Sequence, residues 1–359
     1  MTIASMEAAN PLERGEFRGN AREYFGIWIV NVLLTIVTLG IYSAWAKVRR
    51  NRYFYGNSVV AGHSFDYHAR GKQIFIGRAI VFAIFITIQI VAAFYPLFGI
   101  VVPFILLAVL PWLISRGLRF SARVTSYRNI RFDFVGTGWR AFLSILLGGI
   151  LAFLSFGILA PLASRWLYRY MLNNLRYGDR AFSTDPKLGP LYRVWVLPAL
   201  MVLVGLVLAA LAGWMVYSFD QASDPDVMLD ETQLQLRIIG TIYAAMIALF
   251  IMYAVAGIFY RVGVRNVVMN ATLLDGKHTL FSDLSRGRYF WIVLSNLIVM
   301  VLTLGLMRPW AAVREQRYVV EHTGIVFMGD LDDIMASIQA TGTAATAEYL
   351  DMEGFDFGF

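Results

Sequence analysis

The 359-residue chain contains no cysteine and only four histidines. The absence of cysteine excludes disulfide bonds, thiolate metal sites and a cysteine nucleophile. The histidines (His63, His68, His278 and His322) show neither an HxxxH nor an HExxH spacing. No glycine-rich loop precedes a Lys-Ser or Lys-Thr pair, and there is no GxSxG motif or paired catalytic carboxylate. The sequence therefore predicts no metal, no cofactor and no enzymatic activity.

Charge is scarce as well: charged residues make up 15% of the chain, hydrophobic residues 58%, and the mean hydropathy is +0.61. Water-soluble proteins of this length rarely have such values. The hydrophobic residues are concentrated in seven runs, at residues 25–46, 80–95, 100–114, 141–163, 194–217, 238–260 and 290–306. Most of these runs approach the ~20 residues that cross a bilayer. We predict a mainly α-helical, polytopic membrane protein with about seven hydrophobic segments.

One stretch of sequence occurs twice, because residues 24–53 reappear as residues 289–318 at a constant offset of 265. A weaker third copy lies between them at an offset of 117. A phenylalanine also recurs shortly before each apolar block, at Phe17, Phe65, Phe132, Phe182 and Phe281. These marks predict five repeated hairpin-like units, with short units opening near residues 17, 132 and 281 and long units near 65 and 182.

Polar segments between these units, such as 53–60 and 128–134, have the pattern of short strands and turns, which predicts short cytoplasmic β-hairpins. We expect residues 1–328 to form a single membrane domain. Residues 329–359 are predicted to form an acidic cytoplasmic tail that is partly helical and then disordered.

Lysine and arginine gather in four loops, at residues 47–72, 116–140, 165–193 and 261–288, which hold 23 of the 31. The loop at 217–238 is acidic instead. If all seven runs crossed the membrane, the basic loops would be divided between its two sides, against the positive-inside rule. The rule is obeyed if each of the three repeat copies enters and leaves on one side. We therefore predict that the four basic loops and both termini are cytoplasmic.

Each repeat copy carries a signal that interrupts a helix. The glycines Gly40, Gly157 and Gly305 stand where a helix would end, and Pro161 and Pro309 stand where the next would begin. The first copy predicts a helix over about 22–37 and a short basic helix over about 43–55. Two interpretations stay open at this point. The pair is either a re-entrant or interfacial hairpin, or a spanning helix followed by an ordinary cytoplasmic amphipathic helix.

Two groups of residues are candidates for binding. The first holds cations and aromatic residues of the basic helices, which either contact lipid headgroups or another anion, or serve only as interface anchors. Its members are Trp45, Arg49, Arg52, Arg169, Trp310, Arg314 and Arg317. The second holds uncharged polar residues within the runs, which either line a path or form interhelical hydrogen bonds. Its members are Asn31, Thr38, Gln89, Asn296 and Thr303.

The segments EYFGIWIVN at 23–31 and TLGIYSAWAKVRRNRY at 38–53 resemble sequences of the YjgN-like family of bacterial inner-membrane proteins. The likeness extends over nearly the whole chain, including GDLDD at 329–333. Position 44 is Ala where family members often have Pro. The resemblance implies an inner-membrane location, but it supplies no activity, because the family is similar to others described as a domain of unknown function.

Two functions are compatible with these features. The first is an inner-membrane protein that engages anionic phospholipids as a lipid-handling or membrane-organising element. The alternative is a transporter or channel for a small anionic or amphiphilic solute, in which the broken helices at the TLG motifs surround a path. The centres of the hydrophobic runs contain no charged residue, whereas an ion-coupled pump requires ionisable residues at that depth. Because the cations border apolar runs rather than one soluble face, we predict no nucleic-acid partner.

Overall fold

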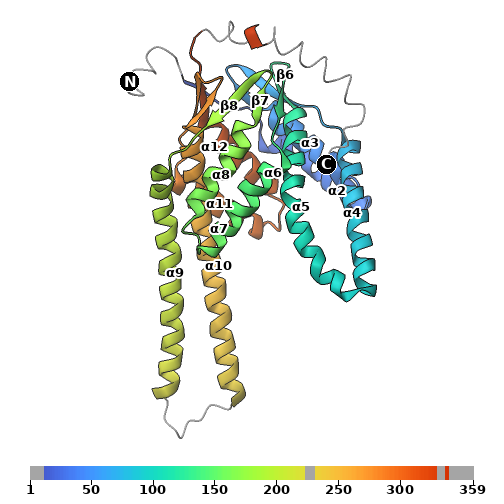
Figure 1. The fold of residues 1–359 in the computed structure, drawn as a ribbon. Helices are drawn as coiled ribbons and strands as arrows, with labels where there is room; N and C mark the ends of the chain where they lie inside the picture. The colour runs from blue at the N-terminus through green and yellow to red at the C-terminus, as the bar shows by residue number, and fades with distance from the viewer. Residues whose placement is uncertain (1–11, 223–230, 330–335, 339–359) are drawn as a thin grey trace.

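The computed structural model describes residues 12–222, 231–329 and 336–338. The described chain is mainly helical, as predicted, and short strands gather at one end of the molecule (Figure 1). The strands are β1 (Leu12–Arg14), β2 (Glu16–Phe17), β3 (Ser58–Val60), β4 (His63–Tyr67), β5 (Thr125–Tyr127), β6 (Ile130–Phe134), β7 (Leu175–Tyr177), β8 (Arg180–Thr184), β9 (Thr272–Leu274), β10 (His278–Ser282) and β11 (Thr323–Val326). The centre of the predicted acidic loop and most of the predicted tail lie outside the described residues.

The helices follow the strands in pairs. They are α2 (Ala21–Val37), α3 (Ser43–Gly56), α4 (Gly71–Phe94), α5 (Pro96–Arg123), α6 (Gly138–Ala141), α7 (Gly148–Leu154), α8 (Ala160–Asn173), α9 (Leu188–Ala222), α10 (Glu231–Met269), α11 (Arg286–Leu302) and α12 (Arg308–Glu321). A π-helical turn, η1 (Phe142–Leu147), joins α6 to α7.

The strands form one antiparallel sheet that closes into a ring. The order around the sheet is β1, β11, β10, β9, β8, β7, β6, β5, β4, β3 and β2. Only Gly15 separates β1, which pairs with β11, from β2, which pairs with β3. The Gly15 N–H donates to the carbonyl oxygen of Thr323 at 2.8 Å. The two ends of the sheet are therefore consecutive residues of the chain, and the ring has no free edge.

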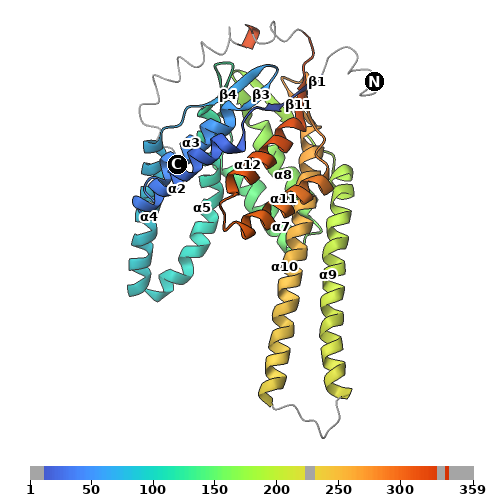
Figure 2. The ribbon, with the colours of Figure 1, turned by 180° about the vertical axis from the view of Figure 1, so that it is seen from behind.

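Each helix pair is inserted between two adjacent strands of this ring. The five resulting units are β2–α2–α3–β3, β4–α4–α5–β5, β6–α6–η1–α7–α8–β7, β8–α9–α10–β9 and β10–α11–α12–β11. All the helix pairs project from the same side of the sheet (Figures 1 and 2). Because the ring closes, the first and fifth units lie side by side, and Val313 of α12 packs against Tyr24 of α2.

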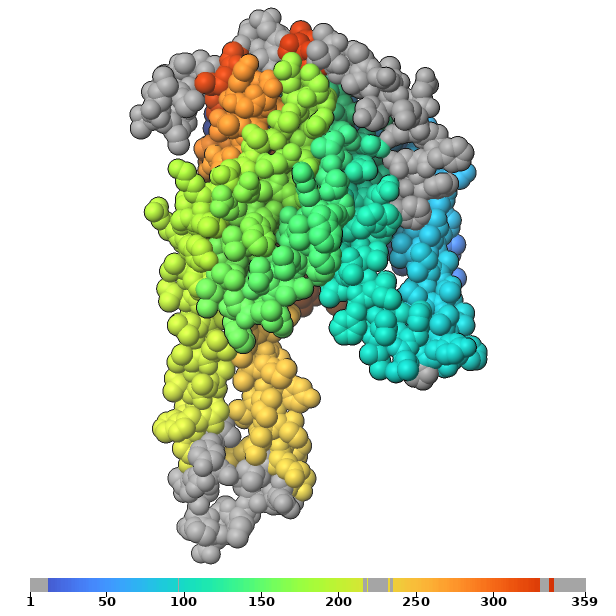
Figure 3. All heavy atoms as spheres, in the orientation of Figure 1, coloured from blue at the N-terminus to red at the C-terminus, as the bar shows by residue number. Residues whose placement is uncertain are grey.

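Two of the helix pairs contain candidate membrane spans. The spans are Gly71–Phe94, Leu97–Arg123, Leu188–Met215 and Gln235–Met269, in α4, α5, α9 and α10. At most 17% of the residues in each apolar window are buried inside the protein, so the apolar side chains face outward. Figure 3 shows the two long hairpins as separate columns below a compact body. These features are those of a multi-pass integral membrane protein.

Two of the other three apolar runs, 25–46 and 141–163, are divided between successive helices, and the third, 290–306, ends in the turn between α11 and α12. In the first copy, α2 and α3 lie where the sequence predicts two helices, so the predicted break is confirmed. Asn20 begins α2, because its side chain accepts a hydrogen bond from the Glu23 N–H at 2.9 Å. Both α2 and α11 have 17 residues, somewhat fewer than a single span requires. That these segments re-enter the membrane stays a prediction.

Candidate functional site

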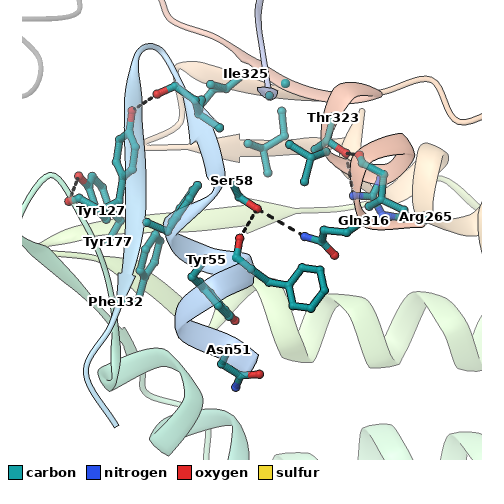
Figure 4. A pocket seen from close by; sticks show the side chains of 18 of the residues that line it. Asn51, Tyr55, Ser58, Tyr127, Phe132, Tyr177, Arg265, Gln316, Thr323 and Ile325 are labelled. Carbon is teal, nitrogen blue, oxygen red and sulfur yellow. Dashed lines mark hydrogen bonds between the residues drawn. The ribbon is translucent and has the colours of Figure 1, made fainter. Parts of the chain in front are cut away.

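A cavity of about 670 Å³ occupies the interior of the strand ring and continues between α3 and α12 (Figure 4). Each unit contributes one pair of residues to the cavity wall. Four of these pairs are Phe65 with Tyr127, Phe132 with Tyr177, Phe182 with Leu274, and Leu280 with Ile325. In the first unit, Gly15 and Val60 line the wall, each one residue beyond the pair formed by Glu16 and Val59. Side chains alternate along a strand, so one register directs residues of β3 to β11 inward, while Gly15 lines the cavity between β1 and β2.

The recurring phenylalanines do not all occupy the same position in this register. Phe65, Phe132 and Phe182 occupy the same inward position in their units, whereas Phe17 and Phe281 do not. Gly15 and Leu280 stand there instead. The sequence spacing of 48 to 99 residues located the strands, but a shift of one residue, as at Phe281, moves a side chain to the other face, and a shift of two, as at Phe17, moves it along the strand.

The aromatic wall of the cavity is held by hydrogen bonds to the backbone. Tyr127 donates its phenolic hydrogen to the carbonyl oxygen of Val60 at 2.7 Å, and Tyr177 donates to that of Tyr127 at 2.9 Å. Burial raises the pKa of both tyrosines above the usual range, so both are neutral at physiological pH. The ring interior is therefore apolar and uncharged.

The end of the cavity nearest the helices is polar. One face of α3 provides Arg50 and Asn51, and one face of α12 provides Glu315 and Gln316. Arg265 of α10 also lines it, and donates to Ser282 Oγ at 2.6 Å and to Thr323 Oγ1 at 2.8 Å. Glu315 accepts a hydrogen bond from the Tyr289 hydroxyl at 2.5 Å. The cavity thus combines an apolar chamber with a polar mouth of mixed charge.

Each unit is joined to the next by a side chain six residues before its second strand. Arg52 donates to the carbonyls of Tyr67 and Ala69 at 3.3 and 3.4 Å, and Arg119 donates to those of Phe134 and Gly136 at 3.0 and 3.1 Å. Asn266 donates to the carbonyl of Leu284 at 2.8 Å, and Arg317 donates to that of Gly19 at 2.9 Å. In the remaining unit, Arg169 forms an ion pair with Asp185 at 3.6 Å. These five contacts run once around the ring. The comparison of the repeat copies selected three of these residues, Arg52, Arg169 and Arg317, and missed Arg119 and Asn266. The missed residues could have been found from their position, six residues before the second strand of the unit, which all five share.

A different pair joins the two helices within the short units. Arg49 Nη1 lies 3.5 Å from Asn31 Oδ1 and 3.1 Å from the Tyr42 hydroxyl. The matching Arg314 Nη1 donates to Asn296 Oδ1 at 3.1 Å and to Ser295 Oγ at 2.7 Å. The third copy has Gly148 and Trp166 at these two positions, and a Cβ added at Gly148 would lie 3.6 Å from the Trp166 ring. The structure therefore brings the predicted asparagines and arginines together as interhelical contacts.

The tips of the short hairpins share one backbone geometry. Leu39, Phe156 and Leu304 all have φ near +50°, and the following glycines have φ between 85° and 94°. The N–H of Gly40 donates to the carbonyl of Thr35 at 2.7 Å, and that of Leu39 to Ile36 at 3.0 Å, which is a Schellman arrangement. The Thr38 hydroxyl accepts a hydrogen bond from the N–H of Tyr42, the residue before α3, at 3.0 Å. Gly157, Gly305, Ser155 and Thr303 repeat these contacts.

The second helix of each short hairpin has a buried residue in its first turn. Ala44, Pro161 and Pro309 occupy its second position, and all three are fully buried. Proline is tolerated there because the first turn leaves its N–H groups unbonded. Gln89 stands apart from the other candidates, exposed along α4.

The model of the family described as "Bacterial protein of unknown function (DUF898)" matches residues 13–352. The chain belongs to the DUF898 family. Among curated proteins it is similar to inner membrane protein YjgN of Salmonella typhimurium strain LT2, at 26% identity, and of Escherichia coli K12, at 28%. Each comparison covers 89% of both chains. No solved structure matches. The resemblance drawn from the repeat words is thereby confirmed.

The remaining candidates of this DUF898 chain pack within the fold. Trp45 lies against Gly71 and stacks near Tyr42 and Phe75, which joins the first unit to the second. Trp310 lies beneath the guanidinium of Arg314, whose central carbon is 5.1 Å from the ring centre. Among the described residues, no group of histidine and acidic side chains is arranged to hold a metal ion.

Proposed function

We propose that this chain is a non-catalytic protein of the bacterial inner membrane that engages anionic phospholipids as a lipid-handling or membrane-organising element. In this proposal the strand ring and both termini are cytoplasmic. The long hairpins cross the bilayer, and the three short hairpins enter its cytoplasmic leaflet and return. The five strand–helix–helix–strand units then act as repeats of one in-to-in hairpin.

The observation that carries the proposal is the chemistry of the short hairpin tips. Leu39, Phe156 and Leu304 are 94%, 97% and 94% exposed on the protein. A left-handed residue after a helix is usually glycine, since an L side chain costs roughly 1–2 kcal/mol there. A large apolar side chain gains nothing in this position from protein contacts. It gains free energy if the surrounding medium is hydrocarbon.

Charge placement supports the same orientation. The basic loops at 47–72, 116–140, 165–193 and 261–288 all include strands of the ring, so their cations lie towards one side of the molecule. That side is cytoplasmic by the positive-inside rule. A collar of cations beside inserted apolar tips is the arrangement that attracts anionic headgroups.

The depth of the tips tests the insertion. Because the chain has no cysteine, single substitutions Leu39→Cys, Phe156→Cys and Leu304→Cys can each carry a bimane label in liposomes. We expect quenching by nitroxides attached to lipid chains at these sites, and quenching by aqueous iodide at the control site Lys277→Cys, an exposed turn of the ring. Equal iodide quenching at the tips and at position 277 would refute the hairpin insertion.

A second experiment separates headgroup binding by Arg49 and Arg314 from their interhelical contacts. The protein is equilibrated with mixed phosphatidylglycerol and phosphatidylethanolamine, and the retained lipids are counted by native mass spectrometry. The doubly substituted R49Q/R314Q protein should lose the preference for phosphatidylglycerol, and R49K/R314K should keep it, because lysine retains the charge but not the planar fork. If both variants melt earlier and retain wild-type lipids, the arginines only hold the hairpins together.

Transport of an anionic or amphiphilic solute is the second candidate, and the central position of the ring cavity favours it. The cavity wall includes none of the TLG tips, so a path would run through the ring rather than around the broken helices. A flux assay in proteoliposomes over anions and small amphiphiles tests it, and silent vesicles across that series would count against transport.

A further inference from the structure

We propose that the ring cavity binds a single-chain amphiphile with an anionic head group, its chain between the aromatic side chains of the ring and its head at Arg265. This site is separate from the lipid contacts of the hairpin tips. It lies inside the protein, on residues that the sequence comparison did not select.

The shape of the cavity favours one chain. On α12 and the following strand the wall runs from Ala312 to Thr323 at helical spacing, a length of roughly 16 Å. On α3 it runs from Arg50 to Ser58 in the same way. The cavity volume of about 670 Å³ lies within the ~300–1,000 Å³ of small-molecule pockets. A space of this volume suits one extended chain.

The part of the cavity inside the strand ring is apolar. Phe65, Phe132, Phe182, Tyr127 and Tyr177 surround it, and the hydroxyls of both tyrosines are already bonded to backbone carbonyls. Ile338, which is 2% exposed, packs into the same cluster together with Phe327. This chamber therefore offers contacts to hydrocarbon and no unbonded phenol to a polar ligand.

The charges of the mouth select the sign of the head group. Arg265 is half-buried, it donates to the neutral hydroxyls of Ser282 and Thr323, and it forms no ion pair with a carboxylate in the part of the chain that the structure describes. Arg50 also lines the mouth and has no such ion pair there. The one carboxylate of the lining, Glu315, accepts a hydrogen bond from Tyr289. A partly desolvated guanidinium with neutral partners favours binding of an anion. Either a carboxylate or a monophosphate can be this anionic head group.

Competition for one labelled ligand tests the proposal on the full-length protein in dodecyl maltoside. A dansyl-labelled undecanoate is bound first and is then displaced by dodecanoate, dodecyl phosphate or dodecanol at equal mole fraction in the micelle. We expect both anions to compete at least tenfold better than the alcohol. Equal competition by dodecanol would refute the anionic head. Equal competition by two-chain phosphatidylglycerol would place the probe on the lipid-facing surface instead.

Two substitutions locate the ligand. Arg265→Gln keeps donors near Ser282 and Thr323 but loses the charge, and should weaken both anions about tenfold, with little change for dodecanol. Leu280→Phe gives the fifth unit the residue that three other units carry at that position, so the ring tolerates it, and should weaken all three ligands by filling the chamber. Lys277→Gln removes an exposed ring charge and should change nothing.

The outcomes are separable from misfolding and from the function proposed above. Thermal unfolding of each variant in detergent shows whether it folds, and if Arg265→Gln fails, the competitor series and Leu280→Phe still decide. Wild-type binding by Leu280→Phe would exclude the ring as the site. Label depths at the hairpin tips are measured independently, so a failed ligand assay leaves the lipid proposal standing, and the reverse also holds.

Discussion

At the scale of single residues, several buried polar groups in the ring are held by side-chain hydrogen bonds. His278 is the sharpest example, because its side chain is 3% exposed and its Nδ1 accepts a hydrogen bond from the backbone N–H of Met328 at 3.0 Å. Its ring also packs against Phe327. This histidine therefore fixes the chain just after the last strand only while Nδ1 is unprotonated.

Acid should weaken that contact. Burial, with Lys277 and Arg180 nearby, lowers the pKa of His278 below its usual value, although Asp275 opposes the shift. A histidine whose pKa is lower in the folded state stabilises the fold above about pH 6.5, and the stabilisation is lost as pH falls through the folded-state pKa. His278→Asn retains an acceptor that does not titrate. The melting temperature of wild type should fall more than that of His278→Asn between pH 7.5 and 5, whereas exposed His63→Asn should behave like wild type. Parallel curves would exclude this role.

At the scale of elements, the tips of the short hairpins carry residues that the backbone conformation of the turn does not favour. Glycine would suit the left-handed position at each tip, yet the chain places Leu39, Phe156 and Leu304 there. Because glycine is absent from a position that favours it, we infer that the large apolar side chain itself is required at each tip.

Leu304→Gly separates the two requirements. Relief of the left-handed strain should stabilise the detergent-solubilised protein by up to about 1 kcal/mol, less the entropy that glycine adds to the unfolded chain. In bilayers the same substitution removes an apolar anchor, so a label on the adjacent Leu306→Cys should become more accessible to water. Thermal unfolding in detergent and iodide quenching in liposomes measure the two effects. A loss of stability in detergent would show that the Leu304 side chain packs on protein.

The side chains that join neighbouring units provide a second test at this scale. Arg119→Met should destabilise the protein by about 1–3 kcal/mol, because the carbonyls of Phe134 and Gly136 lose their charged donor. Arg116→Met is the matched control on the same helix, since Arg116 is exposed and lies over the ring of Trp112. Urea unfolding in detergent would compare the two variants. Equal midpoints would mean that the Arg119 contacts contribute no more than a surface cation.

At the scale of the whole molecule, sequence and structure agree on what local patterns encode. The helix bounds around residue 40 and the membrane class could be predicted, because capping residues and apolar runs are local signals. The closure of the strands into a ring could not, since it depends on a pairing between residues more than 300 positions apart. The cavity was missed for the same reason. Leu280 and Gly15 share a position with Phe65 only through the register of that ring.

Closure of the ring makes the five units interdependent, and Gly15 is the residue on which it depends. A Cβ at this position would lie 2.6 Å from the Val320 carbonyl oxygen and 2.8 Å from Val320 Cγ1, distances that packed atoms do not adopt. Gly15→Val should therefore separate β1 and β2 from α12 and β11. Gly26→Ala is the control, because no atom lies within 4 Å of its added Cβ.

The decisive measurement is made in another unit of the ring. Ser126, in β5, is 1% exposed, and Ser126→Cys gives a single thiol that the closed ring protects. If the ring is one cooperative unit, Gly15→Val should raise the rate at which this thiol is labelled, even though the substitution lies in a different unit, and should lower the melting temperature. Protection at position 126 together with a lowered melting temperature would mean that the ring opens only locally. In that case each unit would be stabilised only by contacts with the units next to it. Ring closure would then stabilise only the strands at which the ring closes, and the other units would be unaffected.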